Sequence, residues 1–130
     1  MLTANDFRRI ALGMKDATEG AHMGHPDFRV NGRIFATIHP DHRAGMVKLT
    51  PEQQEDFIRD YPGTFAPEAG AWGREGCTRV TLAAGDEEAV GEAMTLAWQN
   101  VARAAAAKAA KPSRARKMPS RSKTRSPRTR

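Results

Sequence analysis

The residues of this sequence best suited to chemistry are its basic side chains, which fall into two groups. One group occupies the last 20 residues, where nine Lys and Arg occur without any Asp or Glu. Such cations neutralise nucleic-acid phosphates by releasing condensed counterions, without reading the base sequence. We therefore expect a nucleic acid to be bound by Lys111, Arg114, Arg116, Lys117, Arg121, Lys123, Arg125, Arg128 and Arg130.

The second group consists of five cations on predicted β-strands or at their turns. Arg29, Lys48 and Arg79 share the outward-facing parity of their strands, so they would line up across one sheet face. Arg33 and Arg74 fall at the tips of two predicted hairpins. Long donors on rigid strands can contact phosphates. The alternative interpretation is an ordinary solvated sheet face, on which Lys and Arg are common.

The formal charge of the chain is divided unevenly between two segments. Residues 1–110 hold 12 Lys and Arg and all 15 acidic residues, which gives −3, whereas residues 111–130 carry +9. A segment composed almost entirely of Arg, Lys, Ser, Thr and Pro cannot bury enough apolar surface to offset its ordering entropy. We therefore predict a folded domain over residues 1–110 and a disordered basic tail over residues 111–130.

Four histidines form two His-x-x-His pairs, His22 with His25 and His39 with His42, which flank the first predicted hairpin. Imidazole quartets can hold Zn²⁺ or Ni²⁺. Pairs at i, i+3 in loops, without Cys or a placed carboxylate, are more typical of loop and capping residues. The sequence therefore favours neither a metal site nor a cofactor.

No pattern of an enzyme stands out. The chain lacks a recognisable Ser/His/Asp or Cys/His constellation, a phosphate-binding loop and a dinucleotide fingerprint, so a non-enzymatic protein is expected. Cys77 is the single cysteine; Arg74 and Arg79 could lower its pKa, although a lone thiol is more often a packed small residue. Trp72 and Trp98 are expected to anchor the core, with base stacking as the alternative for Trp72.

One cysteine favours a reducing compartment, and no apolar run approaches the roughly 18–20 residues of a membrane span. The first residues lack the pattern of a signal peptide. We therefore expect a cytoplasmic protein without membrane contact.

The first predicted hairpin positions several of these residues. Asn31-Gly32 between two β-rich runs indicates a type I′ turn, because that turn needs positive φ at both central residues. The simplest register pairs Phe28 with Phe35. It also places Arg29 beside Ile34 on the opposite face, so that this face carries both charged and apolar side chains. Either the second strand is covered on both faces, or a bulge shifts the register by one residue. Residues 46–49 form the third predicted strand.

The remaining elements follow from caps and breakers. Thr3, Thr50 and Asp86 each precede a helix, over residues 4–15, 51–60 and 87–101 onward. Residues 17–25 and 64–70 are expected to be loops. Residues 71–73 and 78–82 are expected to form a second hairpin around residues 74–76. The order α-β-β-β-α-β-β-α predicts an α+β two-layer sandwich in which helices pack against an antiparallel sheet.

Three stretches carry a family resemblance: HMGHPDFRVNGRIFAT at residues 22–37, KLTPEQQ at residues 48–54 and AWGREGCTRVTL at residues 71–82. In this order they resemble the MmcQ/YjbR family of small bacterial proteins over roughly residues 3–103. The resemblance implies a frataxin-like α/β fold and DNA binding through hairpin wings. It does not extend to the tail.

These observations together predict a monomeric protein that binds nucleic acid, and most simply double-stranded DNA, with little sequence preference. The tail would supply the affinity and the hairpin and sheet cations would position the domain. The alternative is a protein-interaction or small-ligand module with the tail as an electrostatic tether. Metal handling by analogy with frataxin-like folds would need an acidic ridge, which Asp6, Asp16 and Glu19 supply only sparsely.

Overall fold

The computed structural model describes residues 1–22 and 24–110; Met23 and the predicted tail lie outside the described residues. Its first helix, α1 (Ala4–Leu12), starts at the predicted capping box: Thr3 Oγ1 accepts from the Asp6 backbone N–H at 3.2 Å, and the Asp6 carboxylate accepts from the Thr3 N–H at 2.9 Å. The helix ends earlier than predicted, because the chain turns at Gly13. Met14 nevertheless packs against the core.

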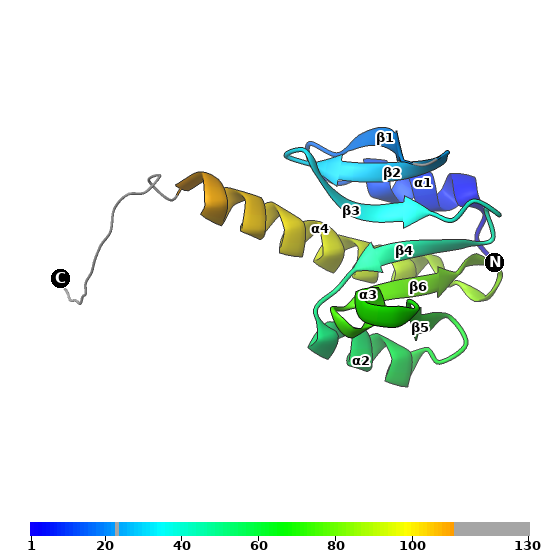
Figure 1. Cartoon of the computed structure of the whole chain (residues 1–130). Coiled ribbons are helices and arrows are strands. Elements are labelled where there is room, and N and C mark those ends of the chain that lie inside the picture. The colour runs from blue at the N-terminus through cyan, green and yellow to red at the C-terminus, as the bar shows by residue number, and fades with distance from the viewer. Residues whose placement is uncertain (23, 111–130) are drawn as a thin grey trace.

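Six antiparallel strands form one sheet in the order β1-β2-β3-β4-β6-β5 (Figure 1). Their bounds are β1 (Thr18–His22), β2 (His25–Val30), β3 (Arg33–Ile38), β4 (Ala44–Lys48), β5 (Phe65–Pro67) and β6 (Cys77–Thr81). The predicted α+β class and antiparallel sheet are confirmed.

The loop predicted over residues 17–25 is wrong, because Thr18–His22 form the edge strand β1. This strand pairs with β2 from Thr18 opposite Arg29 to His22 opposite His25. The first predicted hairpin therefore lies one strand inside the sheet edge.

The β2–β3 connection is the predicted tight turn, with φ of 54° at Asn31 and 79° at Gly32. Val30 pairs with Arg33, but the register then shifts between Phe28 and Arg29. Phe28 consequently lies opposite Ala36 and not opposite Phe35. Of the two arrangements that the sequence left open, the structure contains the bulge, which turns Phe35 fully into the core.

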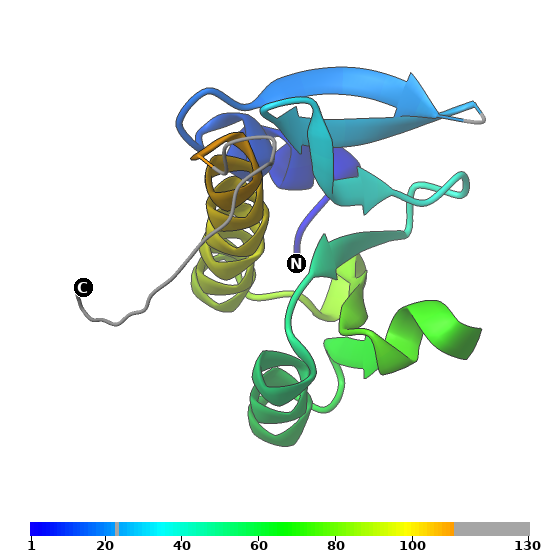
Figure 2. The same ribbon diagram turned by 60° about the vertical axis from the view of Figure 1, so that its left-hand side comes forward.

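The two later helices begin where their caps predict. Thr50 and Gln53 form the capping box of α2 (Pro51–Asp60). The Asp86 carboxylate accepts from the Ala89 N–H at 3.0 Å at the start of α4 (Glu87–Ala110). Figure 2 shows α1, α2 and α4 on one side of the sheet. We call the opposite side the outer face.

The second predicted hairpin is wrong in its first half. Phe65–Pro67, expected to be loop, form β5 beside β6, and Gly70–Arg74 form a short helix, α3, in place of a strand. Arg74 therefore lies at the end of a helix and not at a hairpin tip. In Figure 1, α3 lies in front of β6, on the side away from α4. A short 3-10 turn, η1 (Leu82–Ala84), links β6 to the last helix.

The core lies between the sheet and the helices. The Phe7 ring of α1 packs against Phe28 with centroids 6.2 Å apart, and Gly45 of β4 leaves space for it. On α4, the apolar residues Val90, Ala93, Met94, Ala97 and Val101 are buried. Within the described chain, no helix combines the length and apolar character needed to cross a bilayer.

Candidate nucleic-acid interface

The three sheet cations predicted to share a face do so. Met46 lies opposite Arg79, and Lys48 lies opposite Cys77, so the two cations lie on the same side of the β4–β6 pair. Thr37 of β3 lies opposite Met46 of β4 on one side and opposite Asp27 of β2 on the other, so these three residues share one face of the sheet. Arg29 lies two residues after Asp27 on β2 and shares that face. This side is the outer face.

Arg29 is held by a buried carboxylate. Its Nε lies 2.8 Å from Asp27 Oδ1 and its Nη2 lies 3.1 Å from Asp27 Oδ2, while Asp27 is fully buried. The hydrogen bonds and charge of Asp27 raise the pKa of the Arg29 guanidinium above its usual range. The pair lies over Gly20 of β1, where a Cβ would come within 2.9 Å of Asp27 Oδ1. The charge of Arg29 is thus balanced within the fold.

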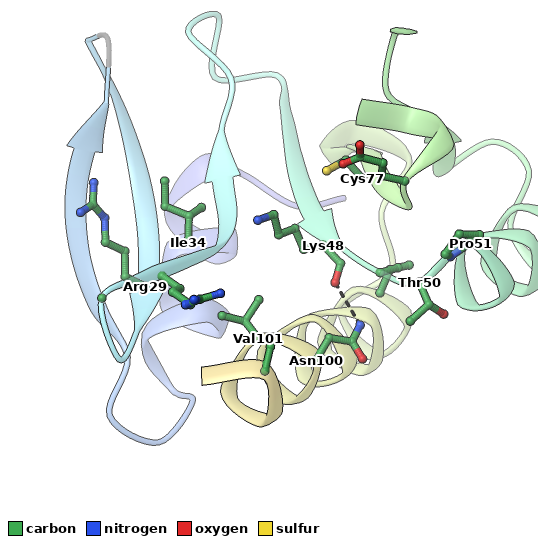
Figure 3. A pocket seen from close by; sticks show the side chains of 13 residues that line it. Arg29, Ile34, Lys48, Thr50, Pro51, Cys77, Asn100 and Val101 are labelled. Atoms are coloured by element: carbon green, nitrogen blue, oxygen red, sulfur yellow. Dashed lines mark hydrogen bonds between the residues drawn. The ribbon is translucent and has the colours of Figure 1, made fainter. Parts of the chain in front are cut away.

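Arg33 and Lys48 line a cavity of about 550 Å³, which we call the gap cavity. It forms where β3 and β4 separate beyond the Ala36–Val47 pair. Figure 3 shows Ile34 and Lys48 on either side of the separation, with Asn100 and Val101 of α4 below them. Neither Arg33 nor Lys48 makes an ion pair within the described residues.

Asn100 fixes the walls of the gap cavity relative to one another. Its Nδ2 donates to the Lys48 carbonyl oxygen at 3.1 Å and to Gln53 Oε1 at 2.8 Å. Gln53 Oε1 also accepts from the Thr50 N–H at 3.0 Å. Both amide hydrogens of Asn100 are therefore used to hold the end of β4 and the start of α2 against α4.

The last helix lines the gap cavity and ends directly before the basic residues 111–130 of the sequence. Ala104 of α4 lines the gap cavity, and the described helix continues for six residues to Ala110. At a rise of 1.5 Å per residue, this is roughly 9 Å. The sequence then continues into Lys111. The helix that lines the gap cavity is thus the element that directly precedes the basic residues 111–130 in the sequence.

The remaining two cations lie apart from this cavity. Arg74 is exposed at the end of α3. Arg79 is half-buried opposite Met46 and lies close enough to Asp41 to help lower the pKa of that carboxyl group, which is lowered mainly by a hydrogen bond from the Arg43 N–H. Glu75, also on the gap cavity, adds a negative charge to this region.

A second cavity, of about 480 Å³, lies on the outer face, and we call it the outer groove. Its walls include the apolar side chains of Ile34, Pro40, Met46 and Trp72. Trp72 is 65% exposed, so the expectation that it anchors the core is wrong. Trp98, in contrast, packs against the core, and its Nε1 donates to the Lys15 carbonyl oxygen at 2.9 Å.

The histidines are divided between different environments. His25 and His39 line the outer groove, where His39 Nε2 lies 2.7 Å from Glu68 Oε2. His42 lines a separate cavity beside the start of α1, and the side chain of His22 lies outside the described residues. In the part of the chain that the structure describes, no three His, Cys, Asp or Glu side chains could hold a metal ion together.

Cys77 is a packed thiol, as the simpler interpretation of the sequence held. It is 4% exposed, and burial raises its pKa, with Glu68 and Glu75 adding to the effect and Lys48 opposing it. The alternative of a pKa lowered by Arg74 and Arg79 is therefore wrong. Of the three acids considered for an acidic ridge, Asp6 caps α1, and Glu19 pairs with Arg8 at 3.0 Å.

Sequence reasoning missed the Asp27–Arg29 pair and the outer groove. The pair had a local signal, because residues i and i+2 of a strand share a face. The groove had none, because it depends on residues from β3, β4 and α3.

Comparisons with known proteins agree with this architecture. The model of the YjbR family matches residues 12–100. The crystal structure of Deinococcus radiodurans protein DR2400, described as a DUF419 domain, superposes with a TM-score of 0.67 and 22% identity, covering 79% of this chain and 80% of that one. A comparison with curated proteins found no match. The structural likeness supports the fold.

Proposed function

The chain belongs to the YjbR family, and from this premise we propose that it is a non-enzymatic protein that binds nucleic acid with little sequence preference. One observation carries the proposal. Arg33 and Lys48 line the gap cavity together with Ala104 of α4, the helix that the nine-cation segment follows in the sequence. The proposal retains the monomeric, cytoplasmic protein expected from the sequence.

The two segments of the chain have different roles in this proposal, because their net charges differ. The first 110 residues carry −3, so the domain as a whole does not attract a polyanion. The tail carries +9 and supplies the affinity, for duplex DNA as for any other polyanion. Arg33 and Lys48, which are free of ion pairs within the described residues, then position the domain by contacting phosphates next to those bound by the tail.

Fluorescence anisotropy with a labelled DNA duplex tests this division. The full chain is compared with a chain ending at Ala110, at two salt concentrations, after circular dichroism has shown that both are folded. If the tail neutralises six to nine phosphates, the slope of log K against log salt is roughly −5 to −8 for the full chain. Equal binding by both chains, or no binding by the full chain at low salt, would refute the proposal.

A pair of matched variants tests the role of the gap cavity. Arg33→Ala with Lys48→Ala is compared with Lys15→Ala and Arg59→Ala, two exposed cations that do not line this cavity. Both double variants lose the same net charge. Only the first should reduce the salt slope, by about 0.9 for each phosphate that is no longer neutralised. If both double variants reduced the salt slope equally, the result would reflect only the loss of net charge, and Arg33 and Lys48 would have no special role.

The outer groove favours a second candidate, a small-ligand or protein-interaction module whose tail acts as a tether. A cavity with apolar walls and a few polar side chains is the usual form of a ligand site. This candidate predicts that nucleic-acid affinity depends on the tail alone. The Arg33→Ala and Lys48→Ala pair would then bind DNA as the Lys15→Ala and Arg59→Ala pair does.

A further inference from the structure

Trp72 is an exposed aromatic side chain on a rigidly held support. It is 65% exposed on α3, whereas its neighbour Gly73 is buried. A Cβ at Gly73 would overlap the backbone carbonyl of Glu68, so the helix lies directly against the chain that precedes it. Gln54 Nε2 donates to the Gly73 carbonyl oxygen at 3.0 Å from the other side of the sheet edge. The backbone of α3 is therefore fixed, while its largest side chain is left in solvent.

The groove beside Trp72 combines an apolar body with polar groups at its ends. Met46 and Ile34 provide apolar surface, and the His39–Glu68 pair provides hydrogen-bonding atoms. Contiguous exposed apolar surface that is rimmed by polar residues marks interaction sites and ligand-binding grooves. The volume of about 480 Å³ falls in the range of sites for small aromatic ligands.

The outer groove and the gap cavity are neighbours. Three residues line both of them: Ile34, Lys48 and Cys77. Lys48 therefore stands where the apolar groove meets the cavity that contains Arg33. We call the two neighbouring cavities together the trough; Trp72 lines one of them, Arg33 lines the other, and Lys48 lines both. Of the acids on it, Glu68 is paired with His39, and Glu75 is exposed.

We propose that this trough binds single-stranded nucleic acid, with an unpaired base stacked on Trp72 and the adjoining phosphates at Lys48 and Arg33. The inference rests on the proposed nucleic-acid function and deepens it by naming the form of the strand. Every base has a π-face, so stacking of this kind is tolerant of sequence. In a duplex the faces of the bases are already stacked, and a base must be extruded before it can reach a side chain.

The charge pattern fits this partner better than it fits an uncharged ligand. A neutral aromatic ligand that filled the outer groove would meet Lys48 without neutralising its charge and would not reach Arg33. A strand of nucleic acid uses the aromatic ring of Trp72 and both cations. Its binding therefore accounts for all three features together.

The test measures the affinity of the full chain for a 12-nucleotide single strand and for a duplex of the same length. Three proteins are compared: the parent chain, Trp72→Ala and Trp72→Phe. Loss of one stacked base corresponds to about 5- to 150-fold in affinity. Trp72→Ala should weaken single-strand binding by a factor in this range and leave duplex binding unchanged. Trp72→Phe should restore most of the loss, because its ring still stacks.

A second measurement does not depend on changing Trp72. The Trp98→Phe chain retains Trp72 as its one tryptophan, and the single strand should quench its fluorescence, whereas the duplex bound at the tail should not. Equal affinities of Trp72→Ala and the parent chain for the single strand would overturn the inference. So would quenching by a free mononucleotide that equals the quenching by the strand, since the groove would then be a small-ligand site.

The two proposals fail in different ways. If the full chain binds neither the single strand nor the duplex at low salt, the proposed function itself is wrong. If it binds both equally and Trp72→Ala changes neither affinity, the proposed function stands and the trough is not the site of an unpaired base.

Discussion

Substitution of Gln54 should reveal how α3 is held in place. Gln54 is a buried residue of α2 whose Nε2 lies 3.0 Å from the carbonyl oxygens of Gly73 and Cys77 and 3.2 Å from Thr78 Oγ1. Its two amide hydrogens are thus shared among three acceptors. We consider Gln54→Met, which keeps the length of the side chain, and Gln54→Glu, which keeps its shape.

The magnitude follows from what the acceptors retain. The Gly73 oxygen keeps the Gly76 N–H at 3.1 Å, and the Cys77 oxygen keeps the Glu68 N–H at 3.0 Å. No carbonyl is therefore left bare, and Gln54→Met loses two net hydrogen bonds of about 1 kcal/mol each, or about 2 kcal/mol of unfolding free energy. At neutral pH, Gln54→Glu should cost about 3 kcal/mol or more, because a buried carboxylate would face oxygen acceptors without a proton to donate.

The pH dependence separates the two variants. Burial and the neighbouring oxygens favour the neutral acid, so the introduced carboxyl group should have a folded-state pKa above the ordinary Glu value of about 4.3. The additional destabilisation of Gln54→Glu is then absent below about pH 4.3 and grows as the pH rises through the folded-state pKa. The destabilisation of Gln54→Met relative to the parent chain should not change with pH.

Urea denaturation of both variants at pH 4 and pH 7 measures these free energies. Thermal unfolding should give a decrease in Tm of roughly 8–16 °C for Gln54→Met. If Gln54→Glu is as stable as the parent chain at pH 7, the amide does not act as the donor that the geometry indicates. A pH-independent difference between the variants would refute the same reasoning.

Three further predictions concern the rest of the domain. Gly45→Ala should reduce the unfolding free energy by about 1–3 kcal/mol in a urea titration, because its Cβ would lie 2.6 Å from the buried ring of Phe7. Gly91→Ala should instead raise it by roughly 0.5–1 kcal/mol, because this position of α4 has open space around it and alanine favours the helix. The thiol of Cys77 should react with a disulfide reagent at pH 8 far more slowly in the folded chain than in urea, since it is 4% exposed and its pKa is raised by burial; equal rates would show that this strand opens freely.

The parts of the fold that the sequence predicted well depend on neighbouring residues. The caps at Thr3, Thr50 and Asp86 satisfy backbone N–H groups within three residues of themselves, and each marks a helix start correctly. Asn31-Gly32 supplies two positive φ angles in succession, so its turn also follows from local chemistry. The bulge could be offered only as one of two alternatives, because it depends on how Phe35 fits the core.

The missed elements depend on distant contacts. Thr18–His22 lack apolar alternation, and they form β1 through pairing with β2, where Gly20 leaves space for Asp27 and Arg29. Gly70–Arg74 contain two glycines, which argue against a helix, yet the close approach of Gly73 to the Glu68 backbone requires one of them. Trp72 stands next to this tight contact and is 65% exposed, contrary to the usual burial of large aromatic residues.

Salt dependence offers a separate check on how the two segments would cooperate. A domain of charge −3 cannot hold a polyanion by long-range attraction, whereas stacking on an aromatic ring involves no net charge. Affinity supplied by the tail should therefore fall steeply as salt rises, while the ratio of single-strand affinities between the parent chain and Trp72→Ala should stay nearly constant. Anisotropy titrations at roughly 50 and 200 mM salt measure both quantities. A ratio that falls toward one at the higher salt would mean that Trp72 acts only by helping to place Lys48 and Arg33 against phosphates, and not as a platform for a base.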